Sequence, residues 1–443
     1  MNEQRLKKFI DDDLRVFSNL DNVRSIPSVV DGFKDSHRKS VYGLIKHGKD
    51  KIKVAQLASA TALLTAYNHG EGALASTIIG LAQKFPGSNN VNLFEPIGQF
   101  GSILSDEAAN PRYIYTKPSE HLRQYIRAED DAILKYREEE GQQLDPEYFL
   151  PVVPMWIVNG VMGIGTGHSS KILSRSPANV IAAVKVIIDC ISNNTPVIPD
   201  LSKYMTPHFN GWKGKITKGD SNTQWIMTGC IEKVSTTVLK ITELPVQYSV
   251  DKYKEILITL MDEGVVKDFD NNSNEDSFEF VVTVPREVGR LTEAQLISKF
   301  KLSLKFGENV TLWDANNKLK RYNDVTEALI EFVNFRLDQY QPRKDYQVAA
   351  LETDLTKISD KLTFINWWNS TKNPHLMTAD EIKAAVVLVD NNNFDSLLSM
   401  QIRSLTVEKV KLLEAEHKEL SSKLIKTKNQ TLRGMFLEDI SQL

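Results

Sequence analysis

Cysteine is scarce in this chain, and its scarcity limits the kinds of protein that the sequence can encode. Only two cysteines, Cys190 and Cys230, occur among 443 residues, and they lie far apart. This excludes a disulfide-stabilised scaffold and a zinc site built from cysteines. It also fits a reducing compartment, in which free thiols persist.

Long apolar runs are also missing. No stretch approaches the roughly 18 apolar residues that a membrane-spanning helix needs. The N-terminus, MNEQRLKKFIDDD, has no apolar segment of the kind that a secretory signal contains. We therefore expect a cytoplasmic protein that has no membrane partner.

The chain has no overall excess of positive charge. Its formal net charge is −3. The hydrophobic fraction of 41% is that of an ordinary globular protein. The charge is nevertheless segregated, because residues 34–53 hold seven Lys or Arg against two Asp, a net charge of +5. Acidic residues gather elsewhere, for example in 137–147. The basic stretch is either a nucleic-acid-binding surface or a merely solvated one.

Recognisable nucleotide and metal motifs are absent as well. GIGTG (163–167) has neither the Lys-Ser/Thr of a phosphate-binding loop nor the GxGxxG spacing, so it indicates a glycine-rich bend. Asp11, Asp12 and Asp13 are consecutive and would point in different directions from a helix. His37, His47 and His69 also lack the spacing of metal ligands, so we expect no metal held by this chain alone.

The first third of the chain contains a helix-turn-helix pattern. Residues 1–30 form an amphipathic N-terminal arm that ends in a break, SIPSVVDG. Within 54–85, two stretches with apolar residues at helical spacing are separated by Asn-His-Gly. A segment rich in Gly, Asn, Ser and Pro follows and becomes strand-like at RYIYT (112–116). The order predicts a winged-helix domain over 31–150, although the same pattern occurs in many helical bundles.

The rest of the chain predicts two further domains. Short alternating strands with interspersed helices predict a mixed α/β domain over 151–322, after a turn-rich hinge at about 150–175. Over 323–443 two runs carry apolar residues at alternating steps of three and four: Val348, Leu351, Leu355, Ile358, Leu362 and Ile365, then Val410, Leu413, His417, Leu420 and Leu424. They predict an antiparallel coiled coil with a small globular tip at about 366–405, and we expect its first helix to begin near Asp324. The alternative is two ordinary amphipathic helices in a bundle. The fold class is therefore α+β and multidomain.

The pair Arg112-Tyr113 raises a chemical question. On a strand, Tyr113 and Tyr115 would share one face. A tyrosine hydroxyl has a pKa near 10, so it attacks a phosphodiester only where cations or a metal ion stabilise the developing charge. Arg112 and the basic stretch could supply such cations. Most Arg-Tyr pairs are structural, and composition alone does not decide between the two roles.

Several long collinear segments resemble a known family. The segments are 24–43 (RSIPSVVDGFKDSHRKSVYG), 53–71, 87–102 and 108–116, and the similarity continues through 162–172, 300–304 and 397–406. They resemble the DNA breakage–reunion region of type IIA DNA topoisomerases, the gyrase A-like part, and look closer to eukaryotic topoisomerase II than to gyrase. With a start at the winged helix and an end after the coiled coil, the chain resembles the medium subunit of the split topoisomerases of T-even bacteriophages. If the chain is phage-encoded, its compartment would be the bacterial host cytoplasm.

The resemblance implies a role for particular residues. Tyr113 would be the nucleophile that forms a 5′-phosphotyrosyl bond, and Tyr115, the rival, would be a packing residue. The residues that would bind and polarise the scissile phosphate are Arg112, Arg24, Lys34 and His69. Those that would bind the flanking DNA are Arg38, Lys39 and Lys53. Ile164 would wedge between base pairs, and its neighbouring glycines would let the backbone approach the duplex. The sequence departs from the family pattern at Asn68, where a His is common, and at KDSH (34–37), which replaces KPGQ or KPVH.

The resemblance also implies partners. The enzyme would be a homodimer acting on double-stranded DNA, and the second domain would be its tower. A separate ATPase subunit would bind ATP, and a TOPRIM subunit would hold Mg²⁺, because this chain lacks the Glu and Asp-x-Asp cluster of that domain. A basic β-pinwheel is missing too, so relaxation and decatenation are expected. Two other hypotheses stay open: a non-enzymatic winged-helix architectural dimer, and a coiled-coil scaffold unrelated to DNA.

Overall fold

The chain folds into two compact units of mixed helix and strand content. The computed structural model describes residues 3–192, 198–275, 277–401 and 405–443. One unit contains the chain up to Arg336 together with Leu437–Leu443, and the other comprises Leu337–Phe436. The mixed content agrees with the predicted fold class. The predicted boundaries near residues 30, 150 and 322 stay predictions.

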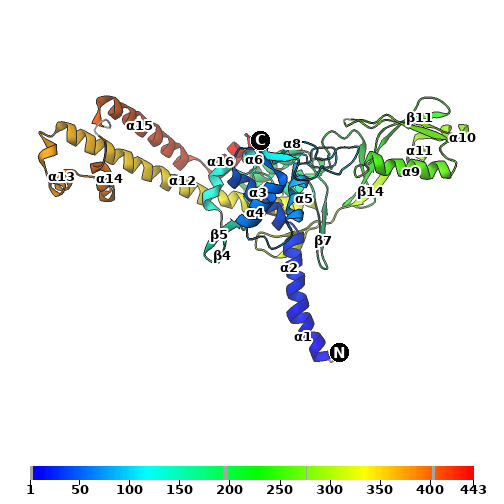
Figure 1. The fold of residues 1–443 in the computed structure, drawn as a ribbon, viewed down its shortest axis with the longest axis horizontal. Helices are drawn as coiled ribbons and strands as arrows, with labels where there is room; N and C mark the ends of the chain where they lie inside the picture. Colours follow the sequence, from blue (N-terminus) through cyan, green and yellow to red (C-terminus); the bar gives the residue numbers. More distant parts are fainter. Residues whose placement is uncertain (1–2, 193–197, 276, 402–404) are drawn as a thin grey trace. The chain divides into compact units, whose positions relative to one another are not determined.

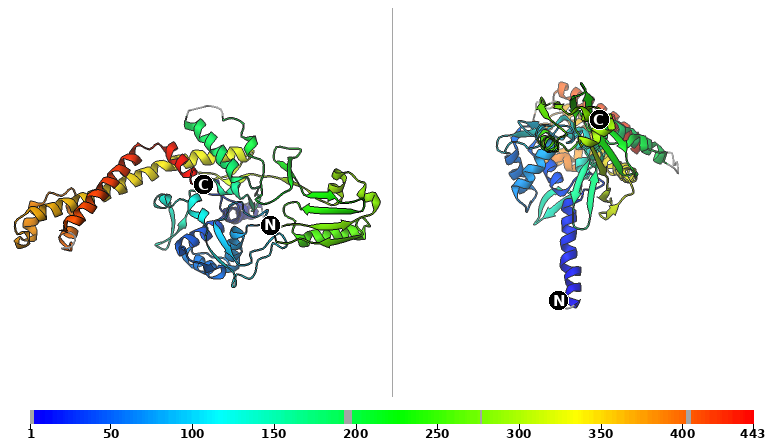
Figure 2. Two further views of the ribbon diagram at one scale, coloured as in Figure 1. Left: turned by 90° about the horizontal axis from the view of Figure 1, so that it is seen from above. Right: turned by 90° about the vertical axis from the view of Figure 1, so that its right-hand side faces the viewer.

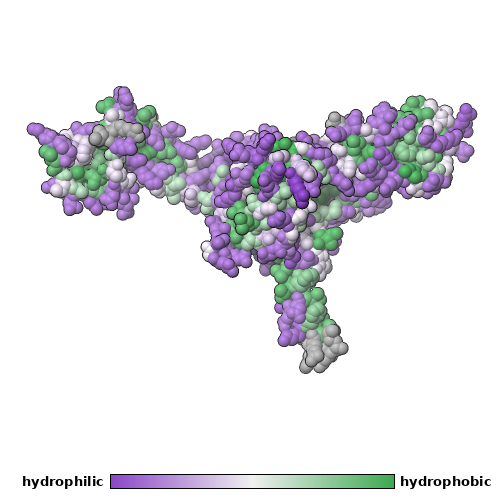
Figure 3. Space-filling model, viewed as in Figure 1, coloured by the Kyte–Doolittle hydropathy of each residue, from purple (hydrophilic) through white to green (hydrophobic). Residues whose placement is uncertain are grey.

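The N-terminal arm is helical almost from its start. It consists of α1 (Glu3–Lys8), a π-helical turn η1 (Phe9–Leu14) and α2 (Arg15–Ser25), shown in dark blue in Figure 1. The helix ends where Ile26 turns to an extended conformation, as the break in the sequence predicted. Apolar side chains recur along the arm at three- and four-residue spacing and are exposed, and part of them is visible in Figure 3: Leu6, Phe9, Ile10, Leu14, Val16, Phe17, Leu20 and Val23.

Three helices and a small antiparallel sheet follow the arm. The helices are α3 (Asp35–His47), α4 (Val54–Leu64) and α5 (Glu71–Ala82). The strands are β1 (Ile52–Lys53), β2 (Phe94–Ile97) and β3 (Tyr115–Pro118), in the order β1-β3-β2. The two helices predicted within 54–85 are confirmed. Leu63 of α4 is exposed, whereas five other apolar residues are buried because they face the neighbouring helices: Val54, Leu57, Ala58, Leu74 and Ile78.

Short elements connect this region to the next. They are α6 (Glu120–Tyr125), η2 (Ala128–Ile133), α7 (Met155–Val158), α8 (Pro177–Ser192) and the hairpins β4–β5 (Tyr136–Glu139, Gln142–Pro146) and β6–β7 (Val161–Ile164, Ser169–Ile172). Trp156 on α7 is fully buried and donates its indole N–H to the carbonyl oxygen of Val29 at 3.0 Å. This contact ties the predicted hinge segment to the chain between α2 and α3.

The mixed α/β region holds most of the strands, drawn in green in Figure 2. One sheet has the order β10-β11-β13-β12 and another β14-β9-β8. The strands are β8 (Lys215–Lys218), β9 (Gln224–Thr228), β10 (Cys230–Lys233), β11 (Val238–Glu243), β12 (Asp268–Asn271), β13 (Phe280–Thr283), β14 (Ser303–Gly307), β15 (Thr311–Trp313) and β16 (Leu319–Arg321). The helices are η3 (Ser202–Tyr204), α9 (Val250–Asp262), α10 (Arg286–Gly289) and α11 (Glu293–Lys299). The predicted strands are thereby confirmed.

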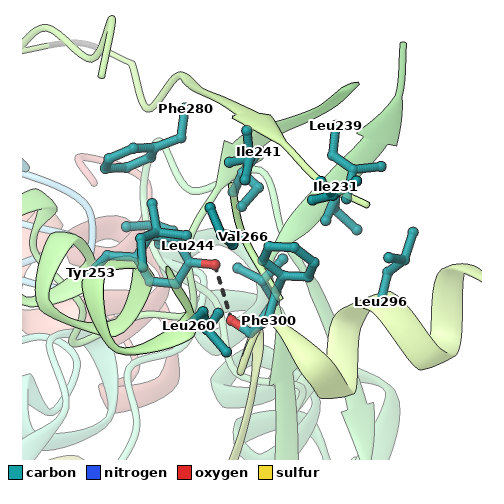
Figure 4. Packing of buried hydrophobic residues seen from close by; sticks show 14 of the residues in the cluster. Ile231, Leu239, Ile241, Leu244, Tyr253, Leu260, Val266, Phe280, Leu296 and Phe300 are labelled. Carbon is teal, nitrogen blue, oxygen red and sulfur yellow. Dashed lines mark hydrogen bonds between the residues drawn. The ribbon is translucent and has the colours of Figure 1, made fainter. Parts of the chain in front are cut away.

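A large apolar core lies against the four-stranded sheet. Alternate residues of β11 and β13 point inward, which is the period of two expected for a sheet with one buried face. Figure 4 shows Phe280, Ile241 and Leu239 from these strands together with Tyr253 of α9. The Tyr253 hydroxyl donates to the carbonyl oxygen of Phe300 at 3.0 Å, so this buried polar group is satisfied.

The long helix predicted in the last third is present. α12 runs over Val325–Ser370, and the Asp324 side chain accepts hydrogen bonds from the first turn, so the predicted start near Asp324 is confirmed. The other elements are η4 (Pro374–Leu376), α13 (Ala379–Ala385), η5 (Asn391–Asn393), α14 (Phe394–Leu398), α15 (Val407–Asn429) and α16 (Leu432–Ile440).

Within the second unit, α12 and α15 pack against each other through the predicted apolar residues. Ile358, Ile365 and Leu413 are buried in one cluster, and Ser359 is hydrogen-bonded to His417 across the two helices at 3.1 Å. An ion pair joins Glu352 to Lys428 at 2.6 Å. The earlier residue of α12 therefore contacts the later residue of α15, which means that the two helices are antiparallel. Of the predicted tip, residues 402–404 lie outside the described residues. In the part of the chain that the structure describes, no helix is both long and apolar enough to cross a membrane.

Candidate active site

The Arg112-Tyr113 pair lies in a turn and not on a strand, which corrects the expectation of a shared face with Tyr115. Strand β3 begins only at Tyr115. The side-chain oxygen of Asn110 accepts a hydrogen bond from the Arg112 N–H at 3.1 Å, and the backbone carbonyl of Asn110 accepts one from the Tyr113 N–H at 2.9 Å. An Asn side chain that bonds the backbone two residues on stabilises a turn in place of the strand. The Tyr113 side chain is 75% exposed, whereas Ile114 is buried.

This turn is fixed to the start of α4. The carbonyl oxygens of Ile114 and Pro111 accept hydrogen bonds from the N–H groups of Val54 and Ala55, each at 3.1 Å. The first N–H groups of a helix have no partner inside the helix, so these contacts satisfy them and hold the turn at the positive end of the helix dipole. Tyr113 is therefore an exposed phenol on an ordered backbone.

Tyr115 has different surroundings. Lys53 pairs with Tyr115 across β1 and β3, and the Nζ atoms of Lys51 and Lys53 lie 5.5 and 5.9 Å from its ring centre. These distances are in the range of cation–π contacts. Tyr115 thus packs under lysine side chains, which agrees with a packing role. Lys53 lies on β1, the strand next to β3, and β3 begins where the Tyr113 turn ends.

Arg24 and His69 line one open pocket of about 330 Å³. Asn68, the departure from the family pattern, lines it too, as does Tyr67, whose ring meets that of His69 edge-on at 5.3 Å. Burial raises the pKa of Tyr67; Asp35 acts in the same direction and Arg24 in the opposite one. Arg24 and His69, 45 positions apart in sequence, are therefore brought to one surface, while Tyr113 and Arg112 lie outside the lining of this pocket.

Lys34 stands at the start of α3, half-buried. Burial lowers its pKa, so the ammonium group is held in an environment poorer in water than that of an exposed lysine. Its neighbour His37 has its pKa lowered to about 3, chiefly by burial, with the charges of Lys34 and Arg38 adding to the effect. His37 is therefore neutral at pH 7 and adds no charge to this surface.

Arg38 and Lys39 have partners inside the protein. Arg38 Nε lies 2.7 Å from an oxygen of Asp31, which is fully buried. Lys39 Nζ lies 3.2 Å from Asp145 and donates to the carbonyl oxygen of Thr65 at 2.7 Å. These contacts give both residues a structural role. Their predicted contact with flanking DNA stays a prediction.

Ile164 lies in the β6–β7 hairpin with 80% of its side chain exposed. The glycines beside it have a structural role, and their predicted approach to a duplex stays a prediction. A Cβ on Gly163 would overlap the carbonyl oxygen of Ser25, and one on Gly165 would overlap the Asn22 side chain. The glycines thus let the hairpin pack against the end of α2, and the hairpin in turn presents Ile164 to solvent.

Two residues of this region escaped the sequence analysis. Arg137, on β4, lines the same pocket as Arg24 and His69, and its partner Asp145, on β5, is fully buried. Their segment appeared only as an acidic stretch, and no motif marks the pair. The pattern that could have found them is a single arginine within an acidic hairpin, which is a weak signal.

Within the described ranges, no group of three or more His, Cys, Asp or Glu is placed to hold a metal ion. The described residues thus offer no set of carboxylates of the kind that Mg²⁺ prefers. The prediction that a partner holds Mg²⁺ stays a prediction.

Comparisons with known proteins identify the family. The family of the A subunits of DNA gyrase/topoisomerase IV matches residues 24–441. DNA topoisomerase 2 of Plasmodium falciparum is 36% identical over 98% of this chain, and that of Saccharomyces cerevisiae is 37% identical over 82%. The chain covers 34% and 26% of these relatives, so it spans about a third of their length or less.

A solved structure agrees. The crystal structure of the Plasmodium falciparum topoisomerase II DNA-binding, cleavage and re-ligation domain matches with a TM-score of 0.86 and 35% identity, over 98% of this chain and 63% of that one. These relatives are eukaryotic, and the likeness to split bacteriophage enzymes stays a prediction. Because the family match covers nearly the whole chain, this protein belongs to the family of DNA gyrase/topoisomerase IV A subunits.

Proposed function

We propose that this chain cleaves and reseals DNA as part of a type II topoisomerase, with Tyr113 as the nucleophile. The observation that carries the proposal is the exposed Tyr113 phenol, next to Arg112, on a turn fixed to the start of α4. The solved relative with the same fold is described as a DNA-binding, cleavage and re-ligation domain. The family and the position of the phenol thus support the same reaction.

The proposed reaction is a reversible transesterification. The Tyr113 oxygen loses its proton and bonds to phosphorus, while the bond from phosphorus to the 3′ oxygen breaks and that oxygen leaves as a hydroxyl. The 5′-phosphotyrosyl ester retains the bond energy, so resealing needs no external energy. Arg112, Arg24, Lys34 and His69 would stabilise the charge on the phosphate oxygens, which is the largest contribution that a protein makes to such a step.

The surrounding fold supports this assignment. We interpret α3, α4, α5 and the sheet β1-β3-β2 as a winged helix, the strand-rich region as the tower, and α12 with α15 as a coiled coil that ends in a dimerisation tip. Ile164, exposed on its hairpin, would insert between base pairs and bend the cleaved segment, since an apolar wedge unstacks a base step.

Partners complete the proposed enzyme. We infer a homodimer, in which each Tyr113 cuts one strand, so that a second duplex passes through the break. ATP binding and Mg²⁺ would come from other chains or segments. Mg²⁺ would supply further charge stabilisation at the scissile phosphate. The exposed apolar side chains of the N-terminal arm support such an association, because contiguous apolar surfaces on soluble proteins mark contacts with other proteins.

Paired tyrosine variants test the proposal. The full chain with its ATPase and magnesium-binding partners is incubated with end-labelled DNA and Mg²⁺, trapped with denaturant, and the DNA-linked peptide is identified. Tyr113→Phe should abolish covalent adducts and strand passage but leave DNA affinity unchanged, whereas Tyr115→Phe should retain adducts. Adducts that persist in Tyr113→Phe would refute the assignment, and a wild-type complex that binds DNA without forming adducts would favour the non-enzymatic architectural protein.

A further inference from the structure

A chain of charged side chains runs from the β4–β5 hairpin to α3. Arg137 on β4 is paired with Asp145 on β5 and lies 3.2 Å from Asp35, at the start of α3. The second carboxylate oxygen of Asp145 lies 3.2 Å from Lys39 on the next turn of α3. Asp145 is fully buried and Lys39 almost so, which means that neither charge is compensated by water. Each therefore depends on its protein partners.

The same chain reaches the turn that carries His69. Lys39 donates to the carbonyl oxygen of Thr65 at 2.7 Å, and Thr65 is the C-cap residue that directly follows α4. The next residue, Ala66, has a φ of +46°, a left-handed conformation that a residue with a Cβ rarely adopts. Such a conformation persists only where the surroundings hold it. His69 follows three residues later.

Arg137 lies at the outer end of this arrangement. Its side chain keeps about a third of its surface exposed and lines the pocket that also contains Arg24 and His69. Glu138 and Glu139 face the same pocket, so the local charge depends on the arginine. Without Arg137, one oxygen of Asp145 loses its partner while the other still holds Lys39. We expect the carboxylate to rotate, and to displace Lys39 and the Thr65 carbonyl that Lys39 holds.

We propose that Arg137 and Asp145 are positioning residues, which act through Lys39 and Thr65 to hold the turn with His69 at the scissile phosphate. The inference rests on the proposed function. It gives Lys39 a part in the reaction that needs no contact with DNA. It also assigns a functional role to the β4–β5 hairpin. Among the described residues, no hydrogen bond joins this hairpin to the Tyr113 turn.

The test compares four variants of the full chain in complex with its partners: Arg137→Gln, Arg137→Lys, His69→Ala, and Arg137→Gln combined with His69→Ala. The single-turnover rate of DNA cleavage is measured at saturating DNA, beside DNA affinity and thermal stability. Arg137→Gln should slow cleavage roughly 10-fold, since a small misplacement of a catalytic group costs that much or more. Arg137→Lys should restore most of the rate, and DNA affinity should stay within about twofold of wild type.

The decisive result is the double variant. If Arg137 acts through the His69 turn, the double variant should cleave no more slowly than His69→Ala alone, because the two changes remove one contribution. Multiplicative rate losses would overturn the inference, as would an Arg137→Gln variant that loses stability but cleaves at the normal rate. Arg123→Leu is the matched control, because Arg123 pairs with Asp131 at 3.0 Å outside this network, and its cleavage rate should be unchanged.

Two safeguards keep the outcome interpretable. If Arg137→Gln does not fold, Asp35→Asn removes one of the two partners of Arg137 and should show the same non-additivity with His69→Ala. Failure of the inference differs from failure of the proposed function: loss of adducts in Tyr113→Phe with normal cleavage in Arg137→Gln rejects only the positioning role. Adducts that survive in Tyr113→Phe reject the proposed function itself.

Discussion

Gly163 offers a sharp test of how the hairpin that carries the exposed Ile164 is held. In Gly163→Ala the new methyl group would overlap the carbonyl oxygen of Ser25, the last residue of α2, and would lie 3.5 Å from Cε of Lys34. A backbone atom at the end of a helix cannot give way as a flexible side chain can, so the hairpin itself must move. That movement threatens the hydrogen bonds from Asn22 to the Thr166 carbonyl, 3.2 Å, and from Thr166 to Asp21, 2.7 Å.

The magnitude follows from these contacts. Overpacking costs about 1–3 kcal/mol, and each of the two hydrogen bonds costs about 1 kcal/mol when lost, so we expect a loss of about 3–5 kcal/mol in the free energy of unfolding. Gly80→Ala is the matched control. Gly80 lies inside α5 with open space where a Cβ would stand, so alanine should stabilise the protein by roughly 0.5–1 kcal/mol through helix propensity.

Urea unfolding followed by circular dichroism measures both variants, and hydrogen exchange of the 165–168 amides reports on the hairpin. We expect the change in the free energy of unfolding to have opposite signs in the two variants, and hydrogen exchange to be faster only in Gly163→Ala. Equal stability of Gly163→Ala and wild type, with unchanged exchange at the hairpin tip, would show that the hairpin does not pack on α2 as described.

Three further predictions concern single side chains. Ile164→Ala should change the free energy of unfolding by less than about 0.5 kcal/mol, because the side chain is 80% exposed, yet reduce DNA bending measured by fluorescence energy transfer; unchanged bending would remove the wedge role. Glu308→Gln should destabilise by about 3–5 kcal/mol in urea unfolding, because it breaks the buried pair with Arg175; a loss below about 1 kcal/mol would contradict this. The pKa of His37 is lowered to about 3, so between pH 6.5 and 3 the unfolded chain binds a proton that the folded chain does not, and stability should fall with acidification by up to about 1.4 kcal/mol per pH unit. His37→Phe should flatten that slope in urea unfolding measured at pH 7 and pH 5, and an identical slope in both proteins would refute the assignment.

Much of the fold was predictable because its information is local. The apolar spacing in 54–85 predicted α4 and α5, and the start of α12 followed from the residues near Asp324. The short strands predicted within 151–322 were also found. The error at Arg112-Tyr113 is local too: an aromatic, β-branched stretch favours a strand, but the Asn110 side chain bonds the backbone and delays the strand until Tyr115.

The candidate site was predictable only in part. The resemblance singled out Tyr113, Arg24 and His69, but it did not show that Arg24 and His69 line one pocket. It also did not reveal that Arg38 and Lys39 are held by buried carboxylates, because Asp145 lies 106 positions from Lys39 in the sequence. No periodicity reports such a pairing, which depends on where a hairpin meets a helix.

The sequence by itself determined the two helices within 54–85, the long helix of the last third, the family, and the segregation of basic charge around residues 34–53, since all of these depend on neighbouring residues or on long collinear motifs. Only the tertiary structure decided which of the cations are paired inside the protein, and why the glycines beside Ile164 are required. The physical reason is that the energy of a buried charge, and the room for a single Cβ, depend on atoms brought close in space from distant parts of the chain.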